Sequence, residues 1–232
     1  MADTEIMAES IIVAIDGPAA AGKGTLARRV AEALDLAYLD TGSLYRAVGR
    51  KLLEAGQSPD DDEAAVSASK TLSPADLARS DLRGEAVADA ASRVSALPAV
   101  REALLAFQRH FAHNPPRGLR GTVLDGRDIG TVVCPEACAK LFVTASTHER
   151  ARRRHEELRG RGEAPTFEAV LREMEARDAR DAARAAAPLR SAGDAYVLDT
   201  SDMDVDSALR TAVAVVRRRC MPGDTDPDGP GQ

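Results

Sequence analysis

Short apolar runs alternate along the chain with longer segments in which hydrophobic residues recur every three or four positions. Such alternation is typical of a mostly parallel β-sheet whose strands are joined by helices. The pattern therefore predicts an α/β protein with three layers and a five-stranded parallel sheet. The runs that would form the strands are Ile11–Asp16, Leu36–Leu39, Gly121–Asp125, Lys140–Thr144 and Tyr196–Asp199.

Helical patterns occupy much of the sequence between these runs. Ser146 and Glu149 have the spacing of a capping box, which places a helix start directly after the fourth run. Gly160 and Gly162 then separate two Arg-bearing helices, so we expect a mobile flap with a hinge at these glycines. The expected helices are Gly24–Leu34, Ser43–Glu54, Ala86–Phe111 interrupted near Pro98, a segment from Ser146 onward, Thr166 to about Ala187, and Val205–Arg217.

One domain is expected over residues 1–220. Residues 57–82 are polar, acidic and rich in Ala and Ser, without a run typical of a strand. We therefore expect a small substrate-binding insert within 57–110 and a lid within 146–187. The last residues, 221–232, are rich in Gly, Pro and Asp, a composition typical of a disordered tail.

The charge balance limits the partners that this protein can have. The 232 residues carry 37 acidic and 31 Lys or Arg side chains, a net charge of −6. Nucleic acids and anionic membranes do not attract such a protein. No apolar run approaches the ~18 residues of a membrane span, and the acidic first ten residues lack a signal-peptide pattern. These features favour a soluble, cytoplasmic protein, and we expect a monomer.

The three cysteines predict neither a disulfide framework nor a zinc site. Their number is odd, and Cys134 and Cys138 are four positions apart rather than in a C-x-x-C pair. We therefore expect reduced thiols in a cytosolic compartment.

A glycine-rich loop directly follows the first predicted strand. It has the pattern G-x-x-x-x-G-K between a buried strand and a helix, with the usual hydroxyl displaced by one position because Gly24 precedes Thr25. Glycines let backbone N–H groups converge on phosphate oxygens, the helix N-terminus adds positive potential, and Lys23 supplies a charge. The pattern predicts an ATP-binding loop of Gly17, Pro18, Ala19, Ala20, Ala21, Gly22, Lys23, Gly24 and Thr25.

A dinucleotide-binding loop is the rival interpretation, because Gly22, Gly24 and Ala27 match the pattern G-x-G-x-x-A. In that motif the first glycine lies at the end of the strand, in the tight turn itself. Here Gly22 follows the strand by six residues, and a lysine stands between the two glycines. The spacing excludes the dinucleotide interpretation.

Three further blocks follow the loop in order, and together the four resemble the bacterial cytidylate kinases, in the nucleoside monophosphate kinase group of P-loop proteins. The resemblance covers roughly Ile11 to Val216, with the later blocks at Asp40–Arg46, Asp125–Thr131 and Arg177–Arg184. It implies transfer of the γ-phosphoryl group of ATP to CMP or dCMP, with Mg²⁺, in pyrimidine nucleotide metabolism. One departure concerns residues 63–82, which look short and strand-poor where the family usually carries a small β-sheet.

The resemblance also implies how the acceptor is bound. Thr41 and Arg46 would contact its sugar and phosphate, and Arg127 would face its phosphate. Ser92, Arg101 and Asp128 would read cytosine. The trio suits that base, because a carboxylate accepts from the cytosine amino group and a guanidinium donates to the ring nitrogen and carbonyl.

Asp125 lies at the end of a strand, where it could hold Mg²⁺ through water, and Thr25 is a second candidate for the metal. A tight turn at Asp125-Gly126 is the alternative for this segment. On the preceding lid helix, Arg153 and Arg154 are candidates for ATP binding.

Four charged residues of the lid share one helical face, since they are spaced i, i+3, i+4 and i+7. They are Arg177, Arg180, Asp181 and Arg184. By resemblance this face closes over the phosphates, with Arg177 and Arg184 joining Lys23 and Arg127 as catalytic residues and with Arg177, Asp181 and Arg184 contacting CMP. The alternative is an exposed face with ordinary ion pairs.

Two other functions stay open on the sequence. The chain could be a kinase for another small acceptor, or a nucleotide-binding protein without activity. The lid arginines argue against the second, because a protein that only binds ATP has no use for a second phosphate clamp. An ADP-release assay with a panel of monophosphates would separate these functions.

Overall fold

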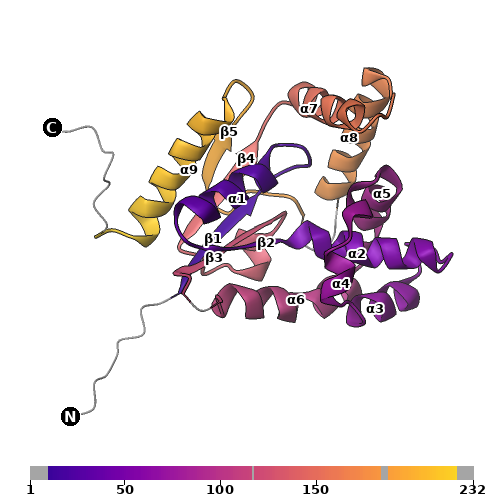
Figure 1. Ribbon diagram of the computed structural model, residues 1–232, viewed down its shortest axis with the longest axis horizontal. Helices are drawn as coiled ribbons and strands as arrows, with labels where there is room; N and C mark the ends of the chain where they lie inside the picture. The colour runs from indigo at the N-terminus through magenta and orange to yellow at the C-terminus, as the bar shows by residue number, and fades with distance from the viewer. Residues whose placement is uncertain (1–9, 117, 184–187, 224–232) are drawn as a thin grey trace, which may run out of the picture.

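Five parallel strands form the centre of the molecule in the computed structural model, which describes residues 10–116, 118–183 and 188–223 (Figure 1). The strands are β1 (Ile11–Asp16), β2 (Ala37–Asp40), β3 (Gly121–Gly126), β4 (Ala139–Thr144) and β5 (Tyr196–Asp199), in the spatial order β2-β3-β1-β4-β5. The predicted five-stranded parallel sheet is confirmed. Because all strands run the same way, their carboxyl ends meet at one edge.

The segments between the strands and after β5 are largely helical. They are α1 (Lys23–Ala33), α2 (Thr41–Glu54), α3 (Asp62–Lys70), α4 (Pro74–Leu77), the short η1 (Ser80–Arg83), α5 (Glu85–Val94), α6 (Pro98–His113), the short η2 (Ile129–Val133), α7 (Thr147–Gly160), α8 (Phe167–Ala182) and α9 (Val205–Cys220). The expected interruption near Pro98 separates α5 from α6, since Pro98 is the first residue of α6 and has no N–H to donate to the preceding turn.

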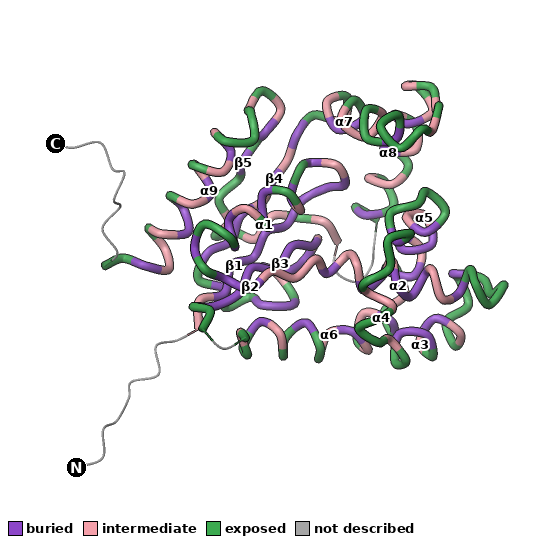
Figure 2. Tube along the Cα trace, viewed as in Figure 1, coloured by how far each residue is buried: buried purple, intermediate pink, exposed green. Residues whose placement is uncertain are grey.

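The core has three layers because β1 buries both of its faces, and burial is greatest along the central strands β1 and β3, whereas the edge strand β5 is mostly exposed (Figure 2). Val13 and Ile15 face a cluster that includes α1 and α9. Ile12 and Ala14 point the other way, toward α6 and η2. Alternate residues of a strand face opposite sides, so an almost continuous apolar run is what a central parallel strand requires.

Residues 57–110 form a helical subdomain beside the sheet. The structure describes all of them, and their elements are α3, α4, η1, α5 and most of α6, without a strand. Leu52, Val94 and Val100 belong to the shared core that ties this subdomain to α2. The subdomain therefore packs through an apolar cluster that it shares with α2. Its designation as a substrate-binding insert stays a prediction.

The lid helices α7 and α8 form a packed hairpin. Ala151 and Leu158 of α7 contact Val170 of α8 in a small core of their own. The turn at residues 160–162 is closed by backbone hydrogen bonds, including Gly162 N–H to the Arg159 carbonyl at 3.0 Å. A hinge at these glycines would have to break that core. The hinge at these glycines stays a prediction, and its opening would require this small core to separate.

The start of α7 also differs from the expected capping box. The Ser146 hydroxyl accepts from the Glu149 N–H at 3.2 Å, as a cap requires. The Glu149 side chain instead pairs with Arg152 and Arg153 of the following turn. Two nearby guanidinium groups attract this carboxylate more strongly than a single backbone N–H does.

The prediction that the cysteines form no disulfide is wrong. Cys138, directly before β4, is bonded to Cys220 at the end of α9, with their Cα atoms 5.4 Å apart. The two cysteines are 82 positions apart in the sequence, so no local pattern links them. Packing of α9 against the sheet brings them together. Cys134 is a free, buried thiol. Among the described residues, no helix is long and apolar enough to cross a membrane. Most of the expected disordered tail lies outside the described residues.

Candidate active site

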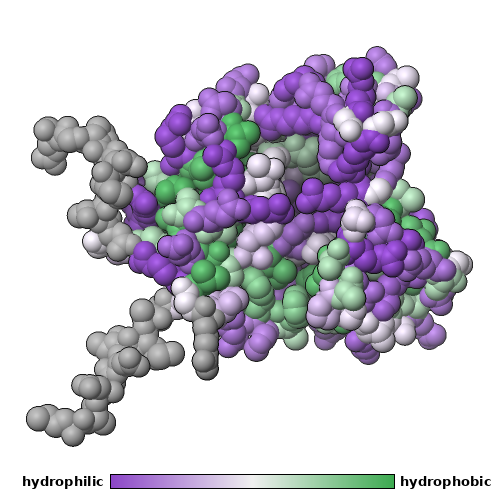
Figure 3. Space-filling model, in the orientation of Figure 1, coloured by the Kyte–Doolittle hydropathy of each residue, from purple (hydrophilic) through white to green (hydrophobic). Residues whose placement is uncertain are grey.

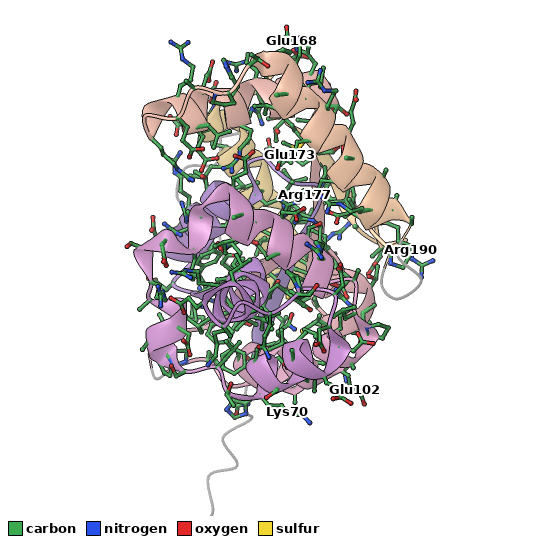
Figure 4. The ribbon with its side chains drawn as sticks, turned by 90° about the vertical axis from the view of Figure 1, so that its right-hand side faces the viewer. Lys70, Glu102, Glu168, Glu173, Arg177 and Arg190 are labelled. Atoms are coloured by element: carbon green, nitrogen blue, oxygen red, sulfur yellow. A yellow bond between two sulfur atoms is a disulfide. The ribbon has the colours of Figure 1, made fainter. Side chains whose placement is uncertain are left out.

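A cavity of about 430 Å³ opens at the carboxyl edge of the sheet. It lies between the phosphate loop, α2, α5, the end of β3 and α8. Figure 4 places Glu173 and Arg177 on the side of α8 that faces α5, across this cavity. Figure 3 shows mostly hydrophilic residues over the lid helices beside it. Substrates of open α/β sheets bind at this edge, where the strand order changes direction.

The predicted ATP-binding loop wraps around the start of α1. Gly17 has φ +148, and a Cβ there would lie only 1.9 Å from the Val143 carbonyl oxygen of β4, so only glycine fits. Gly22 caps α1 with φ +85, a left-handed conformation that glycine adopts without strain. Six loop residues line the cavity, namely Ala19, Ala20, Gly22, Lys23, Gly24 and Thr25. Gly17, Pro18 and Ala21 lie behind them.

Lys23 is the buried cation of this loop, 7% exposed, and its Nζ donates to the Pro18 carbonyl at 2.9 Å. Burial, together with the neighbouring guanidinium groups of Arg127 and Arg177, lowers the pKa of Lys23 to about 7, against the opposite effect of Asp125. Three cations therefore crowd one space. An anionic ligand there would relieve their repulsion, and a polyphosphate suits this requirement.

Asp125, near the end of β3, is an acidic residue that lines the cavity together with the phosphate loop. Its Oδ2 accepts from the Tyr38 hydroxyl at 2.9 Å, and a Cβ at Gly24 would lie 3.2 Å from the same oxygen. A Ser or Thr in place of Gly24 would thus crowd this carboxylate, which accounts for the displaced hydroxyl of Thr25. Burial raises the pKa of Asp125, and Asp40 raises it further, whereas Lys23 and Tyr38 lower it.

These residues fit the metal ion that the resemblance implies, provided that phosphates and water supply most of its ligands. Among the described residues, no group of three His, Cys, Asp or Glu side chains could hold a metal. Mg²⁺ bound to phosphates keeps several water ligands and needs only one or two carboxylates from the protein. Asp125 and the exposed Thr25 line the cavity and can supply such contacts.

The acceptor candidates Thr41 and Arg46 extend the cavity beyond Asp125. Asp40 caps α2 through the Ser43 N–H and also pairs with Arg46, so the cap fixes where that guanidinium lies. The Thr41 hydroxyl donates to the Asp125 carbonyl at 2.7 Å. The Nε of Arg46 is buried and has no hydrogen-bond partner among the described residues. An unpaired buried donor is costly, and a ligand oxygen would satisfy it.

The three residues expected to read cytosine come together from three elements. Ser92 is on α5, Arg101 on α6 and Asp128 directly before η2, and all three line the cavity. Arg101 donates to the Asp128 carboxylate, and these side chains are only 12% and 6% exposed. The Ser92 hydroxyl is buried without a partner among the described residues. The trio therefore offers an acceptor, a donor and a free hydroxyl to a base.

The lid supplies Arg177 and Asp181 to the same space. Arg127 donates to the Asp181 carboxylate at 3.0 Å, which connects the lid to the end of β3. Burial and the nearby Arg127 lower the pKa of Arg177 to about 10, and its Nε is buried without a partner among the described residues. Arg184 lies outside the described residues, so its predicted role is not placed.

The two arginines predicted to bind ATP have different surroundings. Arg154 lines the cavity. Arg153 donates to the Thr200 carbonyl at 2.6 Å and to Glu149 at 2.8 Å, and it is not among the residues that line the cavity. Arg154 is therefore the better placed of the two to contact a nucleotide.

Sequence reasoning passed over Arg150, which lies 4% exposed at the junction of lid and phosphate loop. It donates to the Ala19 carbonyl of the loop at 3.3 Å and forms two hydrogen bonds to Asp178 of α8, at 3.0 and 2.6 Å. In an Arg-rich chain no local pattern marks this residue. Only the packing of the lid hairpin shows that it joins the two parts.

Fold and site define a P-loop protein of the phosphotransferase class. The family model for cytidylate kinase matches residues 13–218, so the chain belongs to the cytidylate kinase family. It is 58% identical over 207 residues to the cytidylate kinase of Paramagnetospirillum magneticum, covering 89% of this chain and 98% of that protein. It is 59% identical over 209 residues to that of a Methylobacterium species, covering 90% and 98%.

A solved structure supports the fold alone. An uncharacterized protein from Eubacterium ventriosum superimposes with a TM-score of 0.51 at 15% identity, over 90% of this chain and 99% of that one. At that identity the likeness concerns the arrangement of strands and helices. The resemblance found in the sequence blocks is thus confirmed by the family match, and the sheet by the structure.

Proposed function

We propose that this chain transfers the γ-phosphoryl group of ATP to CMP or dCMP, giving CDP or dCDP and ADP, as a step of pyrimidine nucleotide metabolism. One observation carries the proposal: the phosphate loop, the crowded cations Lys23, Arg127 and Arg177, and the pair Arg101–Asp128 all face one cavity. A donor site and a base-reading acceptor site in one enclosure are what a nucleoside monophosphate kinase requires. Membership of the cytidylate kinase family supports the same reaction.

Catalysis in such a site depends on position and charge. The nucleophile is an oxygen of the acceptor phosphate, which is already negatively charged, so no protein base has to remove a proton from it. The loop N–H groups and Lys23 hold the β- and γ-phosphates, and Arg127 and Arg177 neutralise charge on the transferred group. Asp125 and Thr25 would hold the Mg²⁺ that accompanies ATP, and this ion would supply further positive charge to the phosphates. Closure of the lid excludes water.

The acceptor is recognised by its base as well as its phosphate. The Asp128 carboxylate accepts from the 4-amino group of cytosine, Arg101 donates to the ring, and Ser92 supplies a further hydroxyl. Thr41, Arg46 and Asp181 contact sugar and phosphate. We assign ATP contacts outside the loop to Arg154, with Arg153 supporting the lid.

We also propose that the enzyme acts in the cytoplasm, where its nucleotide substrates are made and used, and that it acts as a monomer. Sedimentation of the active enzyme tests whether it is a monomer. Specific activity that falls on dilution would contradict a monomer.

The deciding experiment is an ADP-release assay with ATP–Mg²⁺ and CMP, dCMP, UMP, AMP and GMP. We expect kcat/KM for CMP or dCMP to exceed that of the others by about fivefold or more, since a buried polar mismatch costs about 1–3 kcal/mol. A better substrate among the other monophosphates would indicate a different acceptor. Binding of ATP without turnover on any of them would indicate a nucleotide-binding protein that lacks activity.

A further inference from the structure

Asp16, the last residue of β1, is a buried carboxylate that the mechanism above does not use. It is 5% exposed. Its Oδ1 accepts from the Ile129 N–H at 2.8 Å, and its Oδ2 accepts from the Gly130 N–H at 2.8 Å. Burying a carboxylate is costly unless hydrogen bonds compensate it. Each oxygen of Asp16 has such a bond, so the carboxylate is matched to these two N–H groups.

The two N–H groups belong to the start of η2, immediately after Arg127 and Asp128. Before those two residues the chain runs in β3, which pairs with β1 so that Gly126 lies opposite Asp16. The backbone of Asp16 therefore lies beside Gly126, which precedes Arg127 and Asp128. Its side chain binds Ile129 and Gly130, which follow them.

Arg127 and Asp128 thus form a two-residue bridge that is fixed at both ends by one residue. Each points a functional side chain into the cavity, where Arg127 meets Asp181 and Asp128 meets Arg101. Side chains that recognise a ligand must be held within about 0.5 Å of their working position. A bridge with a loose end would let both move by more than that.

We propose that Asp16 is a positioning residue for acceptor recognition, whose carboxylate fixes the Arg127–Asp128 bridge and thereby sets the selectivity for cytosine. The inference rests on the proposed function, which places the base at Asp128. Asp16 is not among the residues that line the cavity, so it acts through the bridge without contact to the nucleotide.

The role requires a group that accepts twice. A carboxylate only accepts, whereas the amide of asparagine accepts through its oxygen and presents NH₂ to the second N–H. Asp16→Asn therefore keeps the size of the side chain and removes one of the two anchors. Burial raises the pKa of Asp16 to about 6, against the two N–H bonds that lower it, so the group is ionised at pH 8.

The test compares wild type and Asp16→Asn at pH 8, by kcat/KM for CMP and UMP and by the Kd of ATP. We expect the KM for CMP to rise about tenfold and the CMP/UMP ratio of kcat/KM to fall about fivefold or more, as one buried hydrogen bond is lost. The Kd of ATP should stay within about threefold, since the loop keeps its own glycines.

The control is Asp204→Asn at the N-cap of α9. The Asp204 carboxylate also accepts a backbone N–H, from Ser207 at 2.7 Å, and this substitution should change none of the three parameters. A lower stability with an unchanged CMP/UMP ratio and an unchanged KM for CMP would overturn the positioning role.

A second variant separates this inference from the proposed function. If Asp16 acts through Asp128, the double variant Asp16→Asn/Asp128→Asn has the same CMP/UMP ratio as Asp128→Asn alone, whereas a further full decrease would overturn the inference. A wild-type enzyme without preference for CMP would overturn the proposed function itself. Should Asp16→Asn fail to fold, amide hydrogen exchange of the wild type decides. Slow exchange at Ile129 and Gly130 without nucleotides is expected, and exchange as fast as in exposed loops would contradict the anchor.

Discussion

The phosphate loop takes consecutive residues, 17–25, whereas the acceptor side of the same cavity draws on α2, α5, α6, the end of β3 and α8. In the proposed reaction, the loop binds mainly with backbone N–H groups and one lysine. The acceptor side would bind with side chains that lie up to 140 positions apart, from Thr41 to Asp181. Phosphate needs only convergent donors, which a short turn can provide. A base needs donors and acceptors at fixed places, which several elements must supply together.

The two regions also meet through the lid. Arg150 joins α7 and α8 to the carbonyl of Ala19 in the loop, and Asp181 joins α8 to Arg127 on the acceptor side. One rigid hairpin therefore contacts both halves of the cavity. The comparison predicts that changes in the loop affect turnover with every acceptor, whereas changes on the acceptor side alter the choice among acceptors.

The largest effect is expected from Lys23→Ala. Turnover should fall about 10²–10⁴-fold with every monophosphate, because a cation at the transferred phosphates is lost. The fold should remain, since burial already disfavours the charged amine. Steady-state rates and thermal unfolding measure both quantities. The control is Lys70→Ala. Lys70 is an exposed residue at the end of α3, at the bottom of the view in Figure 4. Turnover within a few-fold of wild type at equal stability would contradict the assignment of this loop to ATP binding.

Asp128→Asn tests the acceptor side. Uracil presents a carbonyl where cytosine has an amino group, so a carboxylate facing it is unpaired at a cost of about 1–3 kcal/mol, or roughly 5–150-fold. The asparagine amide can present either oxygen or NH₂, so the CMP/UMP ratio of kcat/KM should narrow by about that factor. Glu102→Gln, beside Arg101 but pointing outward in Figure 4, is the control. An unchanged ratio would place base selection elsewhere.

Above pH 7, a pH effect should be confined to the donor side. The pKa of Lys23 is lowered to about 7 in the free protein, so at pH 8 most molecules carry a neutral amine. Bound phosphates favour the charged form, so ATP binding takes up a proton there, and the affinity for ATP decreases above pH 7 by up to about tenfold per pH unit. Calorimetry in buffers with different ionisation enthalpies measures the uptake. Equal apparent enthalpies in all buffers, or unchanged uptake in Lys23→Met, would contradict the assignment.

The smallest effect on turnover and on acceptor choice is expected from removal of the disulfide, whose cysteines do not line the cavity. Closing a loop of 82 residues stabilises a fold by about 4–5 kcal/mol in the chain-entropy model, and measured values are often lower. Cys138→Ser should therefore lower the free energy of unfolding while both substrate KM values stay within about twofold. Added reductant should not destabilise this variant further. A change in the CMP/UMP ratio would show that the disulfide reaches the acceptor side.

The sequence by itself determined the strands, the phosphate loop and the chemical class of the protein. The strand bounds differ from the predicted runs by at most one residue, because an apolar run between polar turns is a local property. The loop was recognisable because all its parts are consecutive, from the strand before Gly17 to the helix after Gly22. The acceptor residues were found only by resemblance, since neither Ser92 nor Arg101 carries a local signal.

Only the tertiary structure decided which of many similar residues act together. It distinguished Arg154 at the cavity from Arg153 at Thr200 and joined Arg150 to the loop. It paired Cys138 with Cys220, and it bonded the Asp16 carboxylate to the two residues that follow the Arg127–Asp128 bridge. Periodicity and turn chemistry are set by neighbours along the chain, so they can be read from the sequence. Contacts between distant side chains depend on how whole helices pack on the sheet, and identical arginines differ only in where that packing puts them.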